Sequence, residues 1–105
     1  MLEKETTKFE KTVIVGIITQ NQSEDKLTEY LDELEFLTFT AGGEVIKRFF
    51  QKMERPNPKT FLGTGKMDEI NRYIKQNKVS TVIFDDELSP SQQKNITKLL
   101  DCKVL

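Results

Sequence analysis

Residues 13–19 read VIVGIIT, and this short stretch decides the fold. Five of the seven residues are Val or Ile, which favour strands because their branched Cβ restricts the side chain. A nearly continuous apolar run is typical of a strand that is covered on both faces in a parallel sheet. We therefore predict that residues 13–19 form a central strand.

A helix is expected next along the chain. Ser23 offers an N-cap, and Glu24 and Asp25 place negative charge in the first turn, where it suits the helix dipole. Apolar residues then follow at helical spacing and predict one buried stripe: Leu27, Tyr30, Leu31, Leu34 and Leu37. Gly42 and Gly43 would end this helix.

The middle of the chain predicts a strand, a long loop, a helix and another strand. Over residues 44–53, basic residues interrupt the apolar ones, which indicates an edge strand with one face in solvent. The stretch ERPNPKTFLGTG at residues 54–65 contains two prolines and two glycines and predicts a loop. Helical spacing resumes over residues 66–76, and the apolar residues 79–84 predict a third strand. Loops of this length often carry function.

The sequence SPSQ at residues 89–92 predicts the start of the last helix. Ser89 is the N-cap, Pro90 takes the first helical position, and Gln92 completes a capping box. Residues 103–105 begin a further apolar strand. Because the sequence stops within that strand, we expect it to be a piece of a longer protein.

Strands and helices thus alternate along the chain, which predicts an α/β fold. We expect an open, mostly parallel four-stranded sheet with helices on its faces, and right-handed crossovers favour the strand order 2-1-3-4. Ligands of such sheets bind at the carboxyl ends of the strands, which are followed here by residues 19–22 and 85–88.

The length of 105 residues fits one domain, expected at residues 12–105 after a tail at residues 1–11. With one cysteine, Cys102, and no histidine, the chain has no internal disulfide, cysteine-based metal cluster or histidine-dependent triad. We expect Cys102 to be a small core residue. No apolar run is long enough to span a membrane, and no signal peptide is visible. These features predict a cytoplasmic protein without a membrane partner.

The formal net charge of −1 conceals a strong asymmetry. Residues 24–35 hold six acidic residues against one lysine, whereas residues 47–66 hold six basic residues against one glutamate. The six, called the basic segment below, are Lys47, Arg48, Lys52, Arg55, Lys59 and Lys66. Two solvated faces would explain this pattern. The sharper hypothesis is that the basic segment faces the phosphates of RNA.

The stretch FLGTGK at residues 61–66 invites comparison with a nucleotide-binding loop. The phosphate-loop pattern GxxxxGK[ST] fails, because the chain has Thr60 in place of the first glycine and Met67 in place of Ser or Thr. Gly63, Gly65 and Lys66 could still hold a single phosphate at a helix N-terminus. A glycine turn that starts a helix is the alternative.

Asp85 and Asp86 are weak candidates for a hard cation such as magnesium. Further ligands from elsewhere in the chain are not recognisable, and Ser89 and Pro90 explain the segment as a loop before a capped helix. We therefore predict no catalytic residue, no metal and no cofactor in this chain.

Several of these segments resemble the N-terminal domain of HflX-type GTPases, over nearly the whole chain from about residue 12 to residue 105. The matching segments are ERPNP at residues 54–58, FLGTGK with the following MDEI at residues 61–70, and VIFDDELSPSQQKNI at residues 82–96. The last is the most distinctive, because agreement over so long a stretch is improbable by chance.

The resemblance implies a parent protein that binds and hydrolyses GTP with Mg²⁺ in a separate GTP-binding domain, which follows a helical segment. It also implies that the parent associates with the large ribosomal subunit and helps to split stalled ribosomes. The N-terminal domain would touch ribosomal RNA and regulate the GTPase, so its partners would be the large subunit, its RNA and the parent's own helical and GTP-binding domains. The alternative is a stand-alone small nucleotide-binding α/β domain, which fold class alone suggests.

Overall fold

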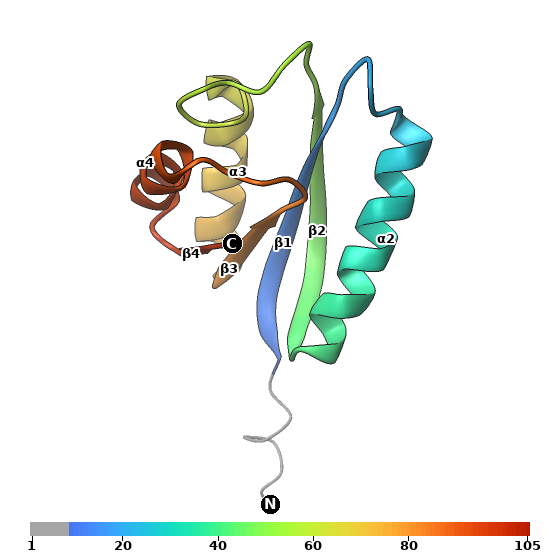
Figure 1. The fold of residues 1–105 in the computed structure, drawn as a ribbon. Coiled ribbons are helices and arrows are strands. Elements are labelled where there is room, and N and C mark those ends of the chain that lie inside the picture. Colours follow the sequence, from blue (N-terminus) through green and yellow to red (C-terminus); the bar gives the residue numbers. More distant parts are fainter. Residues whose placement is uncertain (1–8) are drawn as a thin grey trace, which may run out of the picture.

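The strand β1 (Glu10–Ile18) lies at the centre of a four-stranded sheet. The computed structural model describes residues 9–105. Val13, Ile14 and Val15 are fully buried, because helices cover both faces of the sheet at this strand (Figure 1). The predicted central strand is thereby confirmed, although it begins at Glu10 rather than at Val13.

The other elements follow in the predicted alternation. They are α2 (Glu24–Thr40), β2 (Gly43–Lys52), α3 (Thr64–Asn77), β3 (Thr81–Phe84), α4 (Pro90–Leu100) and β4 (Lys103–Val104). The strands pair in parallel in the order β2-β1-β3-β4. This arrangement confirms the predicted α/β class and the strand order 2-1-3-4, with β2 as the expected edge strand.

The helices lie on two sides of the sheet, α2 on one and α3 with α4 on the other (Figure 1). The side of α3 and α4 holds the main core, with fifteen buried apolar residues. The α2 side holds a cluster of three: Ile14, Leu27 and Leu31. Since successive strand residues point to opposite faces, Val13 and Val15 join the main core whereas Ile14 joins the small cluster. Most of the apolar burial therefore lies under α3 and α4.

Helix α2 buries less than the predicted stripe. Leu27 and Leu31 are buried and Leu34 is partly buried, but Tyr30 is 43% exposed and Leu37 is 54% exposed. The helix packs against β1 and β2 through Leu27 and Leu31, and the flank that carries Tyr30 and Leu37 remains in solvent. The predicted stripe is wrong at these two positions.

The predicted ends of α2 are close to the observed ones. The Ser23 hydroxyl accepts a hydrogen bond from the Lys26 amide at 3.2 Å, as an N-cap should. The helix ends at Thr40, and Gly42 then adopts a left-handed conformation with φ of 95°. Gly43 is already the first residue of β2. Gly42 therefore ends the helix, whereas Gly43 does not.

The irregular pattern of β2 has a structural cause. Thr12 pairs with Val45, whereas the next residue of β1, Val13, pairs with Lys47, so Ile46 has no partner opposite it. Such a bulge is rare in a parallel pair but is favoured at the edge of a sheet, and it shifts the alternation of side chains. Val45 packs toward α2 and Ile46 packs toward the main core.

Helix α4 begins with the predicted capping box. The Ser89 amide donates to Oε1 of Gln92 at 2.9 Å, and the Gln92 amide donates to the Ser89 hydroxyl at 3.0 Å. Pro90 takes the first helical position. The first four backbone amides of a helix have no acceptor within the helix. The capping box satisfies one of them, the amide of Gln92, and also bonds the amide of the N-cap residue Ser89.

The remaining elements differ from prediction by a few residues at their ends. Helix α3 begins at Thr64 rather than at Lys66, and β3 begins at Thr81 rather than at Val79. Cys102 is half-buried beside the main core, as expected of a core residue. Burial, together with the charge of Asp101, raises the pKa of its thiol.

Candidate functional site

The loops that follow β1 and β3 meet at the carboxyl edge of the sheet. The Asp85 amide donates to the carbonyl of Val15 at 2.7 Å, which holds the loop after β3 against β1. The Gln22 side chain donates to the carbonyl of Ile17 at 3.1 Å and folds the loop after β1 back onto its strand. Residues 19–22 and residues 85–88, which were expected at this edge of the sheet, therefore both lie there.

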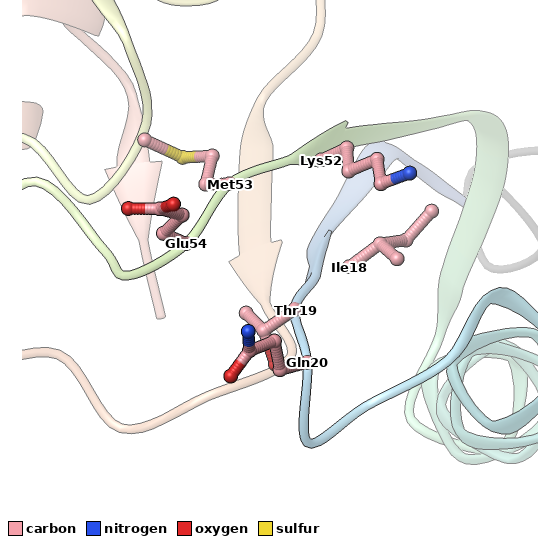
Figure 2. Close-up of a pocket in the computed structure, with 6 residues that line it drawn as sticks. All are labelled: Ile18, Thr19, Gln20, Lys52, Met53 and Glu54. Atoms are coloured by element: carbon pink, nitrogen blue, oxygen red, sulfur yellow. The ribbon is translucent and has the colours of Figure 1, made fainter.

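A hollow of about 270 Å³ opens at the same edge, between the ends of β1 and β2 (Figure 2). Its lining residues are Ile18, Thr19, Gln20, Lys52, Met53 and Glu54. Figure 2 shows the Lys52 and Glu54 side chains directed away from each other, with Met53 between them along the chain. Lys52 is the member of the basic segment that lines this hollow.

The loop from Met53 to Leu62 has a defined shape. Asn57 and Phe61 exchange two backbone hydrogen bonds of 2.9 Å and 2.8 Å. The Asn57 carboxamide oxygen also accepts from the amides of Lys59 and Thr60, at 2.8 Å and 3.2 Å. An asparagine that bonds the backbone two and three residues further on stabilises a tight turn. The loop is therefore an ordered turn.

Two side chains of α4 attach this turn to the rest of the domain, and we call the pair the loop clamp. Gln92 donates through Nε2 to the carbonyl of Asn57 at 2.8 Å. Asn95 donates through Nδ2 to the carbonyl of Lys59 at 3.1 Å. The clamp joins two of the segments that carry the family resemblance, residues 54–58 and residues 82–96.

Phe61 closes the turn in an unusual backbone conformation. Its φ of 69° lies in the left-handed region, which is uncommon for a residue with a bulky side chain. The ring is buried, and it meets the ring of Phe84 edge to face with centroids 5.4 Å apart. Burial of this ring offsets the backbone strain, because aromatic side chains contribute large apolar surfaces to a core.

Two members of the basic segment are neutralised inside the domain. Arg48 bonds Asp32 at 2.7 Å and Glu35 at 2.8 Å, both on α2. Burial alone would lower the pKa of Arg48, but the hydrogen bonds and charges of Asp32 and Glu35 outweigh it, so the pKa is raised. Lys66 pairs with Glu69 at 3.1 Å on the first turns of α3.

The other four basic residues form no ion pair within residues 9–105. Lys47 lies over the Phe49 ring at 5.6 Å from its centroid, on the α3 side of β2. Lys52 lies at the end of β2, and Arg55 and Lys59 are exposed in the clamped loop. Lys52 is thus the last residue of β2, and Arg55 and Lys59 follow it in the loop, whereas Lys47 and Arg48 project to opposite faces of the strand.

The two glycines of the candidate phosphate turn lie at the start of α3. Gly63 is the N-cap with φ of −68°, and its amide already donates to Oε1 of Gln51 at 3.0 Å. Gly65 has open space where a Cβ would lie. Neither position requires glycine for its backbone angles, and the Gly63 amide is not free to bind a phosphate.

Asp85 and Asp86 occupy the loop after β3. Burial and the neighbouring charge of Asp86 raise the pKa of the Asp85 carboxyl. The Asp86 carboxylate accepts a hydrogen bond from the amide of Glu87 at 2.7 Å. Among residues 9–105, no group of three or more histidine, cysteine, aspartate or glutamate side chains is arranged to hold a metal ion.

Within residues 9–105, no helix is both long and apolar enough to cross a membrane.

The sequence matches a known family. Residues 28–105 fit the family described as GTP-binding GTPase N-terminal. The chain is 78% identical over all 105 residues to a GTPase HflX of Flavobacterium psychrophilum, of which it covers 25%. It is 38% identical over 96 residues to the GTPase HflX of Escherichia coli, a match that covers 91% of this chain and 22% of that protein. A GTPase HflX of Thermofilum pendens is 35% identical over 75 residues, which are 71% of this chain and 18% of that protein.

The chain therefore spans about a quarter of the length of the curated relatives that it matches. The family description places the matching region at the N-terminus of those proteins. Together with the parallel sheet and the two joined motif segments, the match over most of the chain shows that it belongs to the family of N-terminal domains of HflX-type GTPases.

Proposed function

We propose that this chain is the RNA-facing and regulatory N-terminal domain of a cytoplasmic GTPase that binds the large ribosomal subunit and helps to split stalled ribosomes. The chain itself hydrolyses no nucleotide. GTP and Mg²⁺ are held by a separate GTP-binding domain of the intact protein, because Thr60 and Met67 depart from the phosphate-loop pattern here. Support for the parent activity comes from the relatives, which are named GTPases.

One observation supports the RNA-facing role above the others. Lys52 at the end of β2, and Arg55 and Lys59 in the loop that follows, are exposed and have no acidic partner within residues 9–105. The loop clamp bonds the backbone carbonyl of Lys59, so little backbone entropy is lost at this residue when it binds. Contacts of this kind position a protein on phosphates without reading the base sequence.

The structure narrows the proposed RNA surface to fewer residues than the sequence suggested. Arg48 and Lys66 already have carboxylate partners, and binding RNA would require those ion pairs to break. Lys47 lies on the α3 side of β2, away from the clamped loop. We therefore assign the phosphate contacts to Lys52, Arg55 and Lys59, and expect Arg48 to stabilise the fold.

The test uses the full-length protein with Lys52→Gln and Arg55→Gln together. Large-subunit binding is measured across a salt series, with Lys75→Gln in the last turn of α3 as a control that removes one charge. Loss of two phosphate contacts should lower the slope of log K against log salt by about 1.4 to 1.8, because each contact contributes about 0.7 to 0.9. Lys75→Gln should keep the wild-type slope.

Wild-type affinity and slope in the double variant, with an unchanged melting temperature, would overturn the RNA-facing role. A loss in Lys75→Gln of about half that in the double variant would also overturn it, because equal losses per removed charge would show a general effect of net charge.

A further inference from the structure

A second hollow lies between the clamped loop and α4. It has a volume of about 370 Å³ and is lined by Lys59, Thr60, Asn95, Lys98 and Leu99. The loop supplies one wall and α4 supplies the other. The hydrogen bond from Asn95 to the carbonyl of Lys59 joins the two walls at 3.1 Å. The hollow is therefore part of the folded domain and does not depend on a free loop.

Both charged residues of this hollow are cations. Neither Lys59 nor Lys98 forms an ion pair within residues 9–105, and no acidic side chain lines the hollow. Arg48 and Lys66, by contrast, each have a carboxylate partner. Lys98 also lies in the last turn of α4, where a cation suits the helix dipole. That interaction accounts for Lys98 within the fold, whereas no ion pair within residues 9–105 accounts for Lys59.

Two ammonium groups that share a concave surface repel each other and attract an anion. Thr60 cannot readily supply a further donor, because its hydroxyl already donates to the carbonyl of Leu62 at 2.9 Å. Leu99 is 50% exposed and gives the hollow an apolar wall. A sugar attached to a phosphate would cover that wall, whereas a free phosphate ion would leave it in water.

We propose that this hollow binds a phosphate group of an RNA strand between Lys59 and Lys98, with the adjoining sugar against Leu99. It would extend the RNA-facing surface from the end of β2 onto α4. The choice of RNA as the ligand rests on the proposed function, whereas the anion chemistry rests only on the two lysines.

The experiment compares two lysines of α4 in the full-length protein. Lys98→Gln removes a lining residue, and Lys94→Gln makes the same change one turn earlier, outside the lining set. Binding of a labelled, short single-stranded RNA is measured by fluorescence anisotropy between low and high salt. One lost contact should lower the salt slope by about 0.7, which is roughly a fivefold loss of affinity at 0.1 M salt relative to 1 M.

We expect this loss in Lys98→Gln and in Lys59→Gln, and near wild-type binding in Lys94→Gln. Wild-type binding in Lys98→Gln, or equal losses in Lys98→Gln and Lys94→Gln, would overturn the proposal. Melting curves of Lys59→Gln and Lys94→Gln should coincide with that of the wild type, because both side chains are exposed, whereas Lys98→Gln should melt slightly lower because it loses a cation from the last turn of α4.

Competition separates the possible ligands. Unlabelled RNA should displace the labelled strand at concentrations where inorganic phosphate and polyglutamate do not. Equal displacement by inorganic phosphate would assign the hollow to a free ion, and equal displacement by polyglutamate would assign it to an acidic peptide; both results overturn the proposal.

Large-subunit binding distinguishes this proposal from the proposed function. If Lys52→Gln with Arg55→Gln weakens subunit binding while Lys98→Gln leaves RNA binding unchanged, only the hollow is wrong. If Lys98→Gln weakens RNA binding while the double variant binds the subunit as wild type does, only the ribosomal role is wrong.

Discussion

The two sides of the sheet are stabilised in different ways. The side of α3 and α4 has fifteen buried apolar residues and the loop clamp. The α2 side has three buried apolar residues, and it adds the ion pairs from Arg48 to Asp32 and Glu35. Two of the acidic residues at residues 24–35 therefore bind β2 within the fold. Two oppositely charged segments that stand apart in the sequence partly neutralise each other in space.

The largest expected difference between the two sides of the sheet is in the free energy of unfolding lost when a single core residue is truncated. Ile96→Ala removes a fully buried side chain from the main core, and Leu31→Ala removes one from the α2 cluster. Such changes cost about 2–5 kcal/mol, and the cost depends on how far the site can collapse. We expect Ile96→Ala near the top of that range and Leu31→Ala near the bottom, because α2 can settle onto a small cluster. Urea unfolding followed by circular dichroism measures both, and a greater loss for Leu31→Ala would contradict the comparison.

Helix caps give a smaller difference. Ser89 takes part in a reciprocal capping box, and its partner Gln92 also forms half of the loop clamp. Ser23 accepts a single hydrogen bond from Lys26. Ser89→Ala should cost about 1 kcal/mol, and Ser23→Ala should cost less. In a domain of this size, about 1 kcal/mol lowers the melting temperature by roughly 4–8 °C. An unchanged melting temperature in Ser89→Ala would show that the box contributes nothing.

The smallest effect is expected at Asp85, in the loop before α4. Burial, with the charge of Asp86, raises its pKa in the folded state, so the folded protein holds this proton to higher pH than the unfolded chain does. The contribution of Asp85 to the stability of the folded protein therefore falls as the pH rises from the ordinary pKa of aspartate through the raised pKa of Asp85. Asp85→Asn should be slightly more stable than the wild type at pH 7, and the difference should vanish in acid.

Melting curves over a pH series measure the effect at Asp85, with Asp86→Asn as the neighbouring control. If Mg²⁺ raises the melting temperature of the wild type but not of Asp85→Asn, this acidic pair is a cation site after all, and the expected gain in stability is wrong.

The fold could be predicted from local patterns because each pattern has a local cause. The apolar run at residues 13–19 indicated a strand buried on both faces, and the SPSQ motif located the start of α4. The stripe on α2 was predicted too wide, since spacing identifies an apolar helix face but not how much of it the sheet covers. Tyr30 and Leu37 are the residues that this reasoning misplaced.

The candidate site was less accessible to sequence reasoning because its contacts join distant positions. Nothing near Arg48 in the sequence indicates that Asp32 and Glu35 bind it. The loop clamp is likewise made by Gln92 and Asn95, which a local reading assigns to a capping box and a helix surface. The roles of the basic segment and of Gly63, Gly65 and Lys66 in binding phosphate stay predictions.

The loop clamp also constrains the order in which the chain can fold. Its two hydrogen bonds join residues 35 and 36 positions apart, and α3 and β3 lie between them in the sequence. The clamp cannot close before α4 lies against the loop. Contacts across such separations form slowly, because closing the intervening loop costs entropy before the contact is made. The turn at residues 57–61 should thus take its final shape only after α4 has docked, and a chain halted before that step would present this turn to proteases.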